Sequence, residues 1–504
     1  MNRLLRIEAV NLLHSIDDTE DLNTRRGGGY LLLQAVRDVE NKFRDQLSPI
    51  STGASIGLFN LSDATLDESK VREYLCQHPD YRHATFVVDR VAHADFRTCV
   101  EASLARNRWQ QMHTLNFSTE WGRCSEVCGT DEIRPAAAKQ KYKNRPTSLS
   151  VHVRSNAGRE LRQGFYEQEL GGLGSSTAFA CGMDSFADNT EELSTFRQLG
   201  DYAAIPANLN GKMAVFYADG NGFGKIQQAC ESDIDLNAWD RDLKAKRRRL
   251  LHDLLAWQAS TSLGRTQEGK LRFETLLWGG DEMLFLLPAW LGLEFAQRFF
   301  ELTASWDYQG QKLTHSAGLV FAKHNAPISR LQKLAKEKLA EFGKQYDRQQ
   351  NSLSWIVLES FDHVGNNITK FWQRNGIEED GWQKLLLSEE KIRRLRGLIP
   401  ALKNDLPRSA MIRVLRSLAA GKAAKEVRLL RRSYASTDEA LATQNRGEFA
   451  SLWHLLCGSF WENDSSSQEA AMLPAADVVA WTILLELWDY LLPDAPLLST
   501  GGTP

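Results

Sequence analysis

Between residues 212 and 360 the chain alternates short apolar runs with helical patterns, and this order constrains the fold more than any other feature. Helical periodicity predicts helices over Asp240–Ser260 and Ile328–Phe342. Apolar runs bounded by turn residues predict strands at Met213–Ala218, Phe273–Trp278, Met283–Leu287, His315–Phe321 and Ser354–Leu358. We interpret the order as βαββαβ, which is that of a ferredoxin-like fold, and predict an α+β domain over residues 212–380.

Acidic residues lie at two turns of this predicted sheet. The first strand ends in Asp219 and runs into a glycine-rich turn. About 60 residues later, Gly279, Gly280, Asp281 and Glu282 form a tight turn between two apolar strands. Carboxylates can hold Mg²⁺, and glycines let phosphates approach the backbone. Two metal ions about 3.5–4 Å apart can clamp the attacking and leaving oxygens in phosphoryl transfer.

We therefore predict that three catalytic residues, Asp219, Asp281 and Glu282, hold Mg²⁺ or Mn²⁺. Each motif by itself has an ordinary structural interpretation, because Gly-Gly-Asp-Glu makes a good hairpin turn and an aspartate after a strand often caps a helix. The two motifs together, in strand context and with the downstream elements in order, favour the catalytic interpretation.

These residues resemble the large subunit of type III CRISPR effector complexes, a polymerase with paired palm domains that is related to the GGDEF nucleotide cyclases. Asp219 matches the metal-binding aspartate of the family's first strand. The turn 279–282 matches the family's Gly-Gly-Asp-Asp turn with Glu in place of the last Asp, as in GGDEF cyclases. The strand Ser316–Phe321 and the helix after Pro327 are also similar, so the resemblance covers roughly residues 200–360.

The resemblance implies two ferredoxin-like palm domains, the first degenerate and the second catalytic, followed by a C-terminal α-helical bundle. The corresponding domains are a degenerate palm at 1–106, a linker or zinc-knuckle insert at 107–211, the catalytic palm at 212–380 and a helical domain at 381–504. Nucleotide would be bound by Gly220, Asn221, Gly222, Phe223, Gly279, Gly280, Lys336 and Lys338.

In the first hundred residues a helix is predicted over Tyr30–Phe43, and Arg26-Gly-Gly-Gly-Tyr-Leu-Leu32 looks like the start of the first palm's helix. The matching turn, Thr52–Ile56, has no acidic pair, as expected of a degenerate copy. Cys124 and Cys128 resemble the family's zinc knuckle and could supply two ligands of a structural Zn²⁺. They could equally be ordinary buried or loop cysteines.

Charge is distributed unevenly in a chain whose formal net charge is only −3. Thirteen Lys or Arg fall between Lys391 and Arg432, and ten Asp or Glu follow Ser433. The basic segment could bind an RNA backbone or pair with the acidic segment. A second basic run, Lys244–Arg249, could face nucleotide or nucleic acid, or form a solvated helix face.

The function implied by the resemblance is synthesis of a cyclic oligoadenylate from ATP in antiviral defence, triggered by RNA. Its partners would be ATP, RNA and other effector subunits, with a dimer as a further possibility. Two alternatives stay open: a cyclic dinucleotide synthase that uses another NTP, and a catalytically silent RNA-binding scaffold. The chain lacks an apolar run of roughly 18 residues and a signal peptide, so we expect a cytoplasmic protein without a membrane partner.

Overall fold

The computed structural model describes most of the first 400 residues and one C-terminal segment. The described residues are 2–62, 65–113, 126–137, 141–171, 205–266, 268–358, 368–374, 377, 379–403, 408–409, 412 and 478–493. None of the helices in this part of the chain is long and apolar enough to cross a membrane.

The first sheet is antiparallel and has the strand order β2-β3-β1-β4. Its strands are β1 (Asn2–Val10), β2 (Leu47–Thr52), β3 (Ile56–Leu61) and β4 (Thr85–His93). The accompanying helices are α1 (Leu12–Ser15), α2 (Leu22–Lys42), α3 (Glu68–Gln77) and α4 (Phe96–Gln111). Alternate residues of β1, including Leu5 and Ile7, pack with Val36 and Val39 of α2 in one core. The order β1-α2-β2-β3-α3-β4 is therefore a βαββαβ unit.

The second sheet has the strand order β13-β12-β7-β9-β8, and only β12 and β13 are parallel. Its strands are β7 (Lys212–Gly220), β8 (Glu274–Gly279), β9 (Glu282–Pro288), β12 (His315–Lys323) and β13 (Ser352–Val357). Its helices are α7 (Phe223–Ala229), α8 (Asp233–Ser260), α9 (Gly292–Thr303), α10 (Ile328–Lys333) and α11 (Glu341–Tyr346). A π-helical turn, η5 (Leu334–Ala340), joins α10 to α11, and a hairpin is formed by β10 (Asp307–Tyr308) and β11 (Gln311–Lys312).

The prediction for this region is confirmed for all five strands but is wrong about the second helix of the βαββαβ unit. That helix is α9, so the unit is β7-α8-β8-β9-α9-β12, and the predicted helix and strand after residue 328 are additions to it. The sequence hides α9 because the apolar run of β9 continues through Ala289, Trp290 and Leu291 without a polar break.

The segment at 107–211, for which we predict a linker or zinc-knuckle insert, contains the long helix α5 (Leu149–Leu170) and the short strands β5 (Lys141–Tyr142) and β6 (Arg145–Pro146). Apolar periodicity is weak in α5 because Arg154, Ser155 and Arg162 lie on its buried face. In the first domain the predicted helix over Tyr30–Phe43 begins earlier, at Leu22, because the side chain of Asp21 accepts a hydrogen bond from Thr24 N and caps it.

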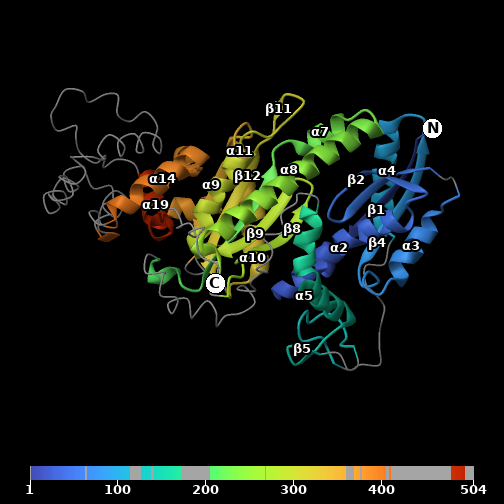
Figure 1. Ribbon diagram of the computed structural model, residues 1–504, viewed down its shortest axis with the longest axis horizontal. Helices are drawn as coiled ribbons and strands as arrows, with labels where there is room; N and C mark the ends of the chain where they lie inside the picture. The colour runs from blue at the N-terminus through green and yellow to red at the C-terminus, as the bar shows by residue number, and fades with distance from the viewer. Residues whose placement is uncertain are drawn as a thin grey trace.

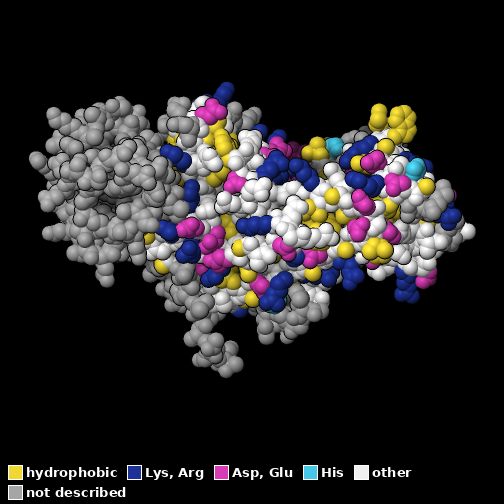
Figure 2. Space-filling model, turned by 90° about the horizontal axis from the view of Figure 1, so that it is seen from above, with side chains coloured by type: hydrophobic (Ala, Val, Ile, Leu, Met, Phe, Trp, Pro, Cys, Tyr) yellow, Lys and Arg dark blue, Asp and Glu magenta, His cyan; other side chains and the backbone are white. Residues whose placement is uncertain are grey.

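Helices α2 and α5 lie between the two sheets, which follow one another along the long axis of the molecule (Figure 1). In α2, Arg26 donates to the fully buried carboxylate of Glu274 in β8 across 3.0 Å, and Arg162 of α5 pairs with the same carboxylate. Basic and acidic side chains are interspersed over the visible surface, with a gathering of basic ones near the middle of the long axis (Figure 2).

The predicted C-terminal bundle lies largely outside the described residues. The described helices within 381–504 are α14 (Glu389–Leu402) and α19 (Val478–Leu487), while α13 (Glu379–Trp382) spans the predicted boundary and α12 (Ile368–Arg374) precedes it. Arg396 of α14 pairs with Glu294 of α9 at 2.8 Å, and the ring of Tyr490 packs 4.1 Å from that of Phe321. These contacts attach the helices to the second sheet.

Replacing Gly158 by Ala should destabilise the protein, because a Cβ there would lie 2.0 Å from the carbonyl oxygen of Asn23 where α2 and α5 touch. We expect a loss of about 1–3 kcal/mol in the free energy of unfolding, as for other overpacked positions. Gly164→Ala on the same helix is the matched control, since nothing lies within 4 Å of its Cβ. Urea unfolding of both variants measures the difference, and equal stability of the two would contradict the close helix contact.

Candidate active site

Two acidic residues are brought together by the pairing of β7 with β9. Asp219 lies directly opposite Glu282 in the antiparallel register. Tyr217, two residues before Asp219, shares its face of the strand. The Tyr217 hydroxyl is 2.8 Å from Glu282 Oε1 and 3.3 Å from Asp219 Oδ2, so it links the two carboxylates.

The third acidic residue, Asp281, lies in the two-residue turn between β8 and β9. Gly280 has a φ of 55°, the left-handed conformation that glycine adopts most readily. Two backbone carbonyls fix the turn: Gly220 N donates to Asp281 O at 3.1 Å, and Arg247 Nη1 donates to Gly280 O at 3.0 Å. The turn is therefore tied both to the end of β7 and to α8.

Two lysines from the α10–α11 helix pair with the carboxylates. Lys344 Nζ is 2.6 Å from Asp219 Oδ2, and Lys336 Nζ is 2.6 Å from Glu282 Oε1. The helix can approach the sheet this closely because β12 has a glycine beneath it. A Cβ on Gly318 would lie 2.2 Å from Ala335 O. The positive charge at the site comes from this helix.

Burial and neighbouring carboxylates raise the pKa of Asp281 and Asp219. Burial and then the charge of Asp219 raise the pKa of Asp281 to about 6. Burial also raises the pKa of Asp219, although Lys344 opposes this shift. The pKa of Tyr217 lies well above its ordinary value because the hydroxyl is buried beside Glu282 and Asp219. A cation bound beside these carboxylates would therefore stabilise the folded protein.

The donor set suits Mg²⁺, which typically takes one or two protein carboxylates and completes its shell with water and substrate phosphates. Within the described residues, no three His, Cys, Asp or Glu side chains are grouped closely enough to hold a metal ion by themselves. Asp219 and Glu282 lie opposite each other on adjacent strands, and each pairs with the ammonium group of a lysine. The residues therefore fit a metal that is shared with a phosphate ligand.

In the predicted nucleotide-binding turn after β7, two side chains already make contacts within the protein. Asn221 Nδ2 donates to Thr314 Oγ1 at 3.1 Å, and its Oδ1 accepts from Ser316 Oγ at 3.0 Å. The ring of Phe223 packs edge-on against Trp239 and His315. What remains for a ligand is the backbone of this turn, where Gly222 has a φ of 78° and precedes α7.

Gly279 and Gly280 differ in their surroundings. A Cβ on Gly279 would lie 2.4 Å from Cβ of Ala54, which belongs to the turn between β2 and β3 of the first domain. Nothing lies within 4 Å of the corresponding position on Gly280. Gly279 therefore allows the two domains to touch, and Gly280 leaves open space beside the turn.

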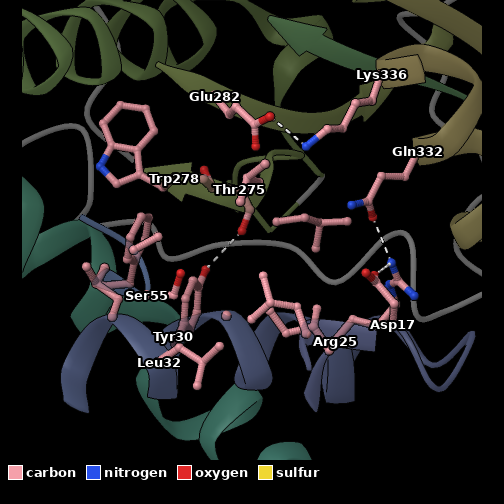
Figure 3. Close-up of a pocket in the computed structure, with 18 residues that line it drawn as sticks. Asp17, Arg25, Tyr30, Leu32, Ser55, Thr275, Trp278, Glu282, Gln332 and Lys336 are labelled. Carbon is pink, nitrogen blue, oxygen red and sulfur yellow. Dashed lines mark hydrogen bonds and ion pairs between the residues drawn. The ribbon is translucent and has the colours of Figure 1, made fainter. Parts of the chain in front are cut away.

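A cavity of about 150 Å³ opens beside Glu282 and Lys336, between the two domains (Figure 3). Tyr30 of α2 lies on one wall, with its hydroxyl 3.4 Å from Thr275 O, and its ring stacks on Phe165. On another wall Arg25 donates to Gln332 Oε1 at 2.7 Å. The cavity is largely apolar and has the Lys336–Glu282 pair at one end. Lys338 is half-buried and does not line it.

The zinc prediction rests on one described cysteine. Cys128 is fully buried, with its Sγ 3.8 Å from Thr147 Oγ1. Cys124 lies outside the described residues. A zinc site therefore stays a prediction.

Three residues that contact the acidic site were missed in the sequence: Tyr217, Lys344 and Arg247. The strand period of two places Tyr217 beside Asp219, so this contact was accessible to pattern reasoning. Lys344 is eight residues after Lys336, but its approach to Asp219 depends on the packing of the helix on Gly318. Arg247 is one of several cations in the run Lys244–Arg249, and only the fold selects it.

A βαββαβ sheet with acidic residues at the adjoining ends of its central strands defines a palm-type domain. Residues 212–354 match the family model of the second palm domain of Cas10/Cmr2. This match confirms, for these residues, the predicted resemblance to the large subunit of type III CRISPR complexes.

Solved structures of Csm1 share this fold at low sequence identity. Csm1 from T. onnurineus matches with a TM-score of 0.51 and 12% identity over 98% of this chain and 70% of that one. A Csm1–Csm4 cassette in complex with cA3 matches with a TM-score of 0.51 and 11% identity over 97% and 69%. The cassette in complex with cA4 matches with a TM-score of 0.43 and 13% identity, and this chain covers only 57% of the matched chain's length. No curated protein matches the sequence.

Asp281→Asn should stabilise the metal-free protein at pH 8. The folded-state pKa of Asp281 is about 6 against an ordinary value of 3.8, so folding becomes less favourable as the pH rises through this interval. Each pKa unit corresponds to about 1.4 kcal/mol, and allowing for partial exposure we expect a gain of about 1–2 kcal/mol in the free energy of unfolding. Urea unfolding at pH 8 and pH 4 checks this, because most of the gain should vanish at pH 4. A loss of stability at pH 8 would contradict the repulsion.

Gly279→Ala should destabilise the contact between the domains, and Ala54→Gly should restore part of the loss. We expect the first change to cost about 1–3 kcal/mol, because its Cβ overlaps that of Ala54. A double-mutant cycle in urea measures the coupling. Additive effects of the two substitutions would show that the residues do not touch.

Proposed function

We propose that the chain is a metal-dependent nucleotidyltransferase that joins ATP molecules through 3′–5′ bonds, releases pyrophosphate and forms a cyclic oligoadenylate. The observation that carries this proposal is the convergence of three acidic residues at one end of the β7–β9 pair, with the pKa of Asp281 raised by burial and then by the charge of Asp219. Grouping acidic side chains in this way does not stabilise the fold. It is what a site that binds a metal ion and nucleotide phosphates requires.

In this proposal Asp219, Asp281 and Glu282 hold Mg²⁺ or Mn²⁺, which supplies charge neutralisation for the transferred phosphoryl group. Lys336 and Lys344 exchange their carboxylate partners for phosphate oxygens when metal and nucleotide bind. Tyr217 keeps the Asp219 and Glu282 carboxylates oriented through its hydroxyl. A carboxylate of the site, or solvent, accepts the proton of the attacking 3′-hydroxyl.

The first domain is proposed to be the degenerate palm. Its strand order, β4-β1-β3-β2, repeats the β12-β7-β9-β8 order of the second sheet, which supports this assignment. The turn between β2 and β3 reaches the acidic turn through Ala54 and Gly279 but carries no acidic pair. The boundaries 1–106, 107–211, 212–380 and 381–504 remain proposals, as does a nucleotide site contributed by the first domain or by a second copy of the chain.

The biological setting is proposed by analogy with the matched structures. Csm1 has been solved with Csm4 and with cA3, which supports an adenylate product and a partner subunit for this chain. We propose antiviral defence with RNA as the trigger. The basic segment Lys391–Arg432, which is a candidate RNA-binding surface, lies mostly outside the described residues.

A catalytically silent scaffold is the second candidate function. Its support is that Lys336 and Lys344 already neutralise Glu282 and Asp219 without a metal. In that case the acidic residues would be structural ion pairs, and neither metal nor nucleotide would bind. A cyclic dinucleotide synthase that uses another NTP remains the alternative among enzymes.

Product formation from each labelled NTP with Mg²⁺ or Mn²⁺, with RNA and partner subunits supplied, tests the proposal. We expect product from ATP and at least about a 100-fold loss in Asp281→Asn, the upper end of the loss for an outer-shell partner of a metal. Asp242→Asn is the matched control, because Asp242 pairs with Lys246 away from the acidic turn. Product from GTP alone would favour the dinucleotide synthase, and no product from any NTP would favour the scaffold.

A further inference from the structure

A second and larger cavity, of about 420 Å³, lies across the Ala54–Gly279 contact from the first. Its walls come from α2, from the turn between β2 and β3, and from α8. The volume is within the range of roughly 300–1,000 Å³ that is usual for ligand pockets. Leu33, Ala54 and Trp278 line both cavities, so these residues lie between them.

Arg247 places a buried positive charge in this second cavity. The residue is only 7% exposed, its guanidinium lies 4.6 Å from the centre of the Trp278 ring, and Nη1 donates to Gly280 O. Its Nε is buried without a hydrogen-bond partner. Within the described residues no carboxylate forms an ion pair with Arg247, and burial lowers its pKa although the charges of Glu169, Asp240 and Asp281 oppose this shift. Arg247 is thus a buried guanidinium with carboxylates nearby but none in direct contact.

Two of the three carboxylates that line the cavity pair with cations that also line it. Glu169 pairs with Arg37 and accepts from Trp278 Nε1 at 2.8 Å. Asp240 pairs with Lys244 at 2.6 Å and accepts from Ser51 Oγ at 3.0 Å. The walls carry five Lys or Arg side chains against three Asp or Glu, so positive charge is in excess.

Two of these five cations are exposed arginines. Arg241 and Arg248 both line the cavity and are exposed. In the part of the chain that the structure describes, neither forms a salt bridge. With Arg247 they surround the cavity with guanidinium groups, which are suited to bidentate binding of phosphate.

We propose that this cavity binds the oligophosphate group of a nucleotide-class ligand beside the acidic turn. The choice of phosphate rests on the proposed function, which offers two sources of the same chemistry. These are the pyrophosphate that leaves and the 5′-triphosphate end of a growing chain. Arg247 connects the cavity to the site, because it would bind the anion while it holds Gly280 O.

An extended nucleic-acid backbone fits the geometry less well. Of the basic run on α8, Lys244, Arg247 and Arg248 line the cavity. Two other cations of the run do not, and they pair with carboxylates of their own helix: Lys246 with Asp242 at 2.6 Å and Arg249 with Asp253 at 2.8 Å. Lys244 also pairs with a carboxylate of its own helix, Asp240, whereas within the described residues Arg247 and Arg248 form no such pair. The cations of the run that lack such a partner therefore gather at one cavity instead of forming a continuous stripe.

Calorimetric titration of the full-length protein with tripolyphosphate, pyrophosphate and single-stranded RNA, without metal, tests the proposal. The double variant Arg241→Gln/Arg248→Gln should bind the oligophosphates at least about tenfold more weakly, a loss of about 1.4 kcal/mol. The matched control is Lys246→Gln/Arg249→Gln, which removes the same charge from the same helix outside the cavity and should change binding less than about twofold. Tighter binding of tripolyphosphate indicates the 5′ end, and tighter binding of pyrophosphate indicates the leaving group.

Asp281→Asn separates this proposal from the proposed function, because it should abolish product formation while oligophosphate binding persists. The proposal is overturned if neither oligophosphate binds, or if the two double variants weaken binding equally. It is also overturned if RNA alone binds in a manner that depends on Arg241 and Arg248. Thermal unfolding of each variant shows whether it is folded.

Discussion

The rest of the site depends on the register of β7 against β9, which sets Asp219 directly opposite Glu282. Like charges at such a position repel, so the surrounding structure must supply positive charge or hydrogen bonds. Tyr217 supplies a hydroxyl, and Lys336 and Lys344 supply ammonium groups. The glycine under the α10–α11 helix matters for the same reason, because it lets both lysines reach the sheet.

The interface between the two domains contains buried ion pairs and is not purely apolar. Glu274 of β8 accepts from Arg26 of α2 and pairs with Arg162 of α5, so one carboxylate joins three segments far apart in the sequence. Removing one member of such a group leaves an uncompensated buried charge, which costs far more than an exposed ion pair contributes. This network fixes the position of β8, and therefore of the acidic turn at its end, relative to the first domain.

Acidic and basic side chains gather close together around the acidic turn. The site holds three carboxylates, and the pKa values of two of them, Asp219 and Asp281, are raised, while the neighbouring cavity has more arginines than carboxylates. Arg247 touches both sides, because it donates to Gly280 O and lines the basic cavity. A ligand that carries both a metal-binding phosphate and a second anionic group would lower the free energy of both regions at once.

The sequence by itself determined the strands of the second sheet and the acidic turn between β8 and β9, because apolar runs and Gly-Gly-Asp-Glu are local patterns. The sequence did not reveal α5 or α9. Helix α5 buries Arg154 and Arg162 against distant segments, which weakens its apolar periodicity. Helix α9 follows the apolar run of β9 without a polar break. Asp219, Asp281 and Glu282 could be nominated from the sequence as a set. Only the tertiary structure showed that Lys344 and Arg247, among many cations, contact the acidic site, and that Gly279 packs against Ala54. These contacts join residues far apart in the sequence, so no helix or strand periodicity could predict them.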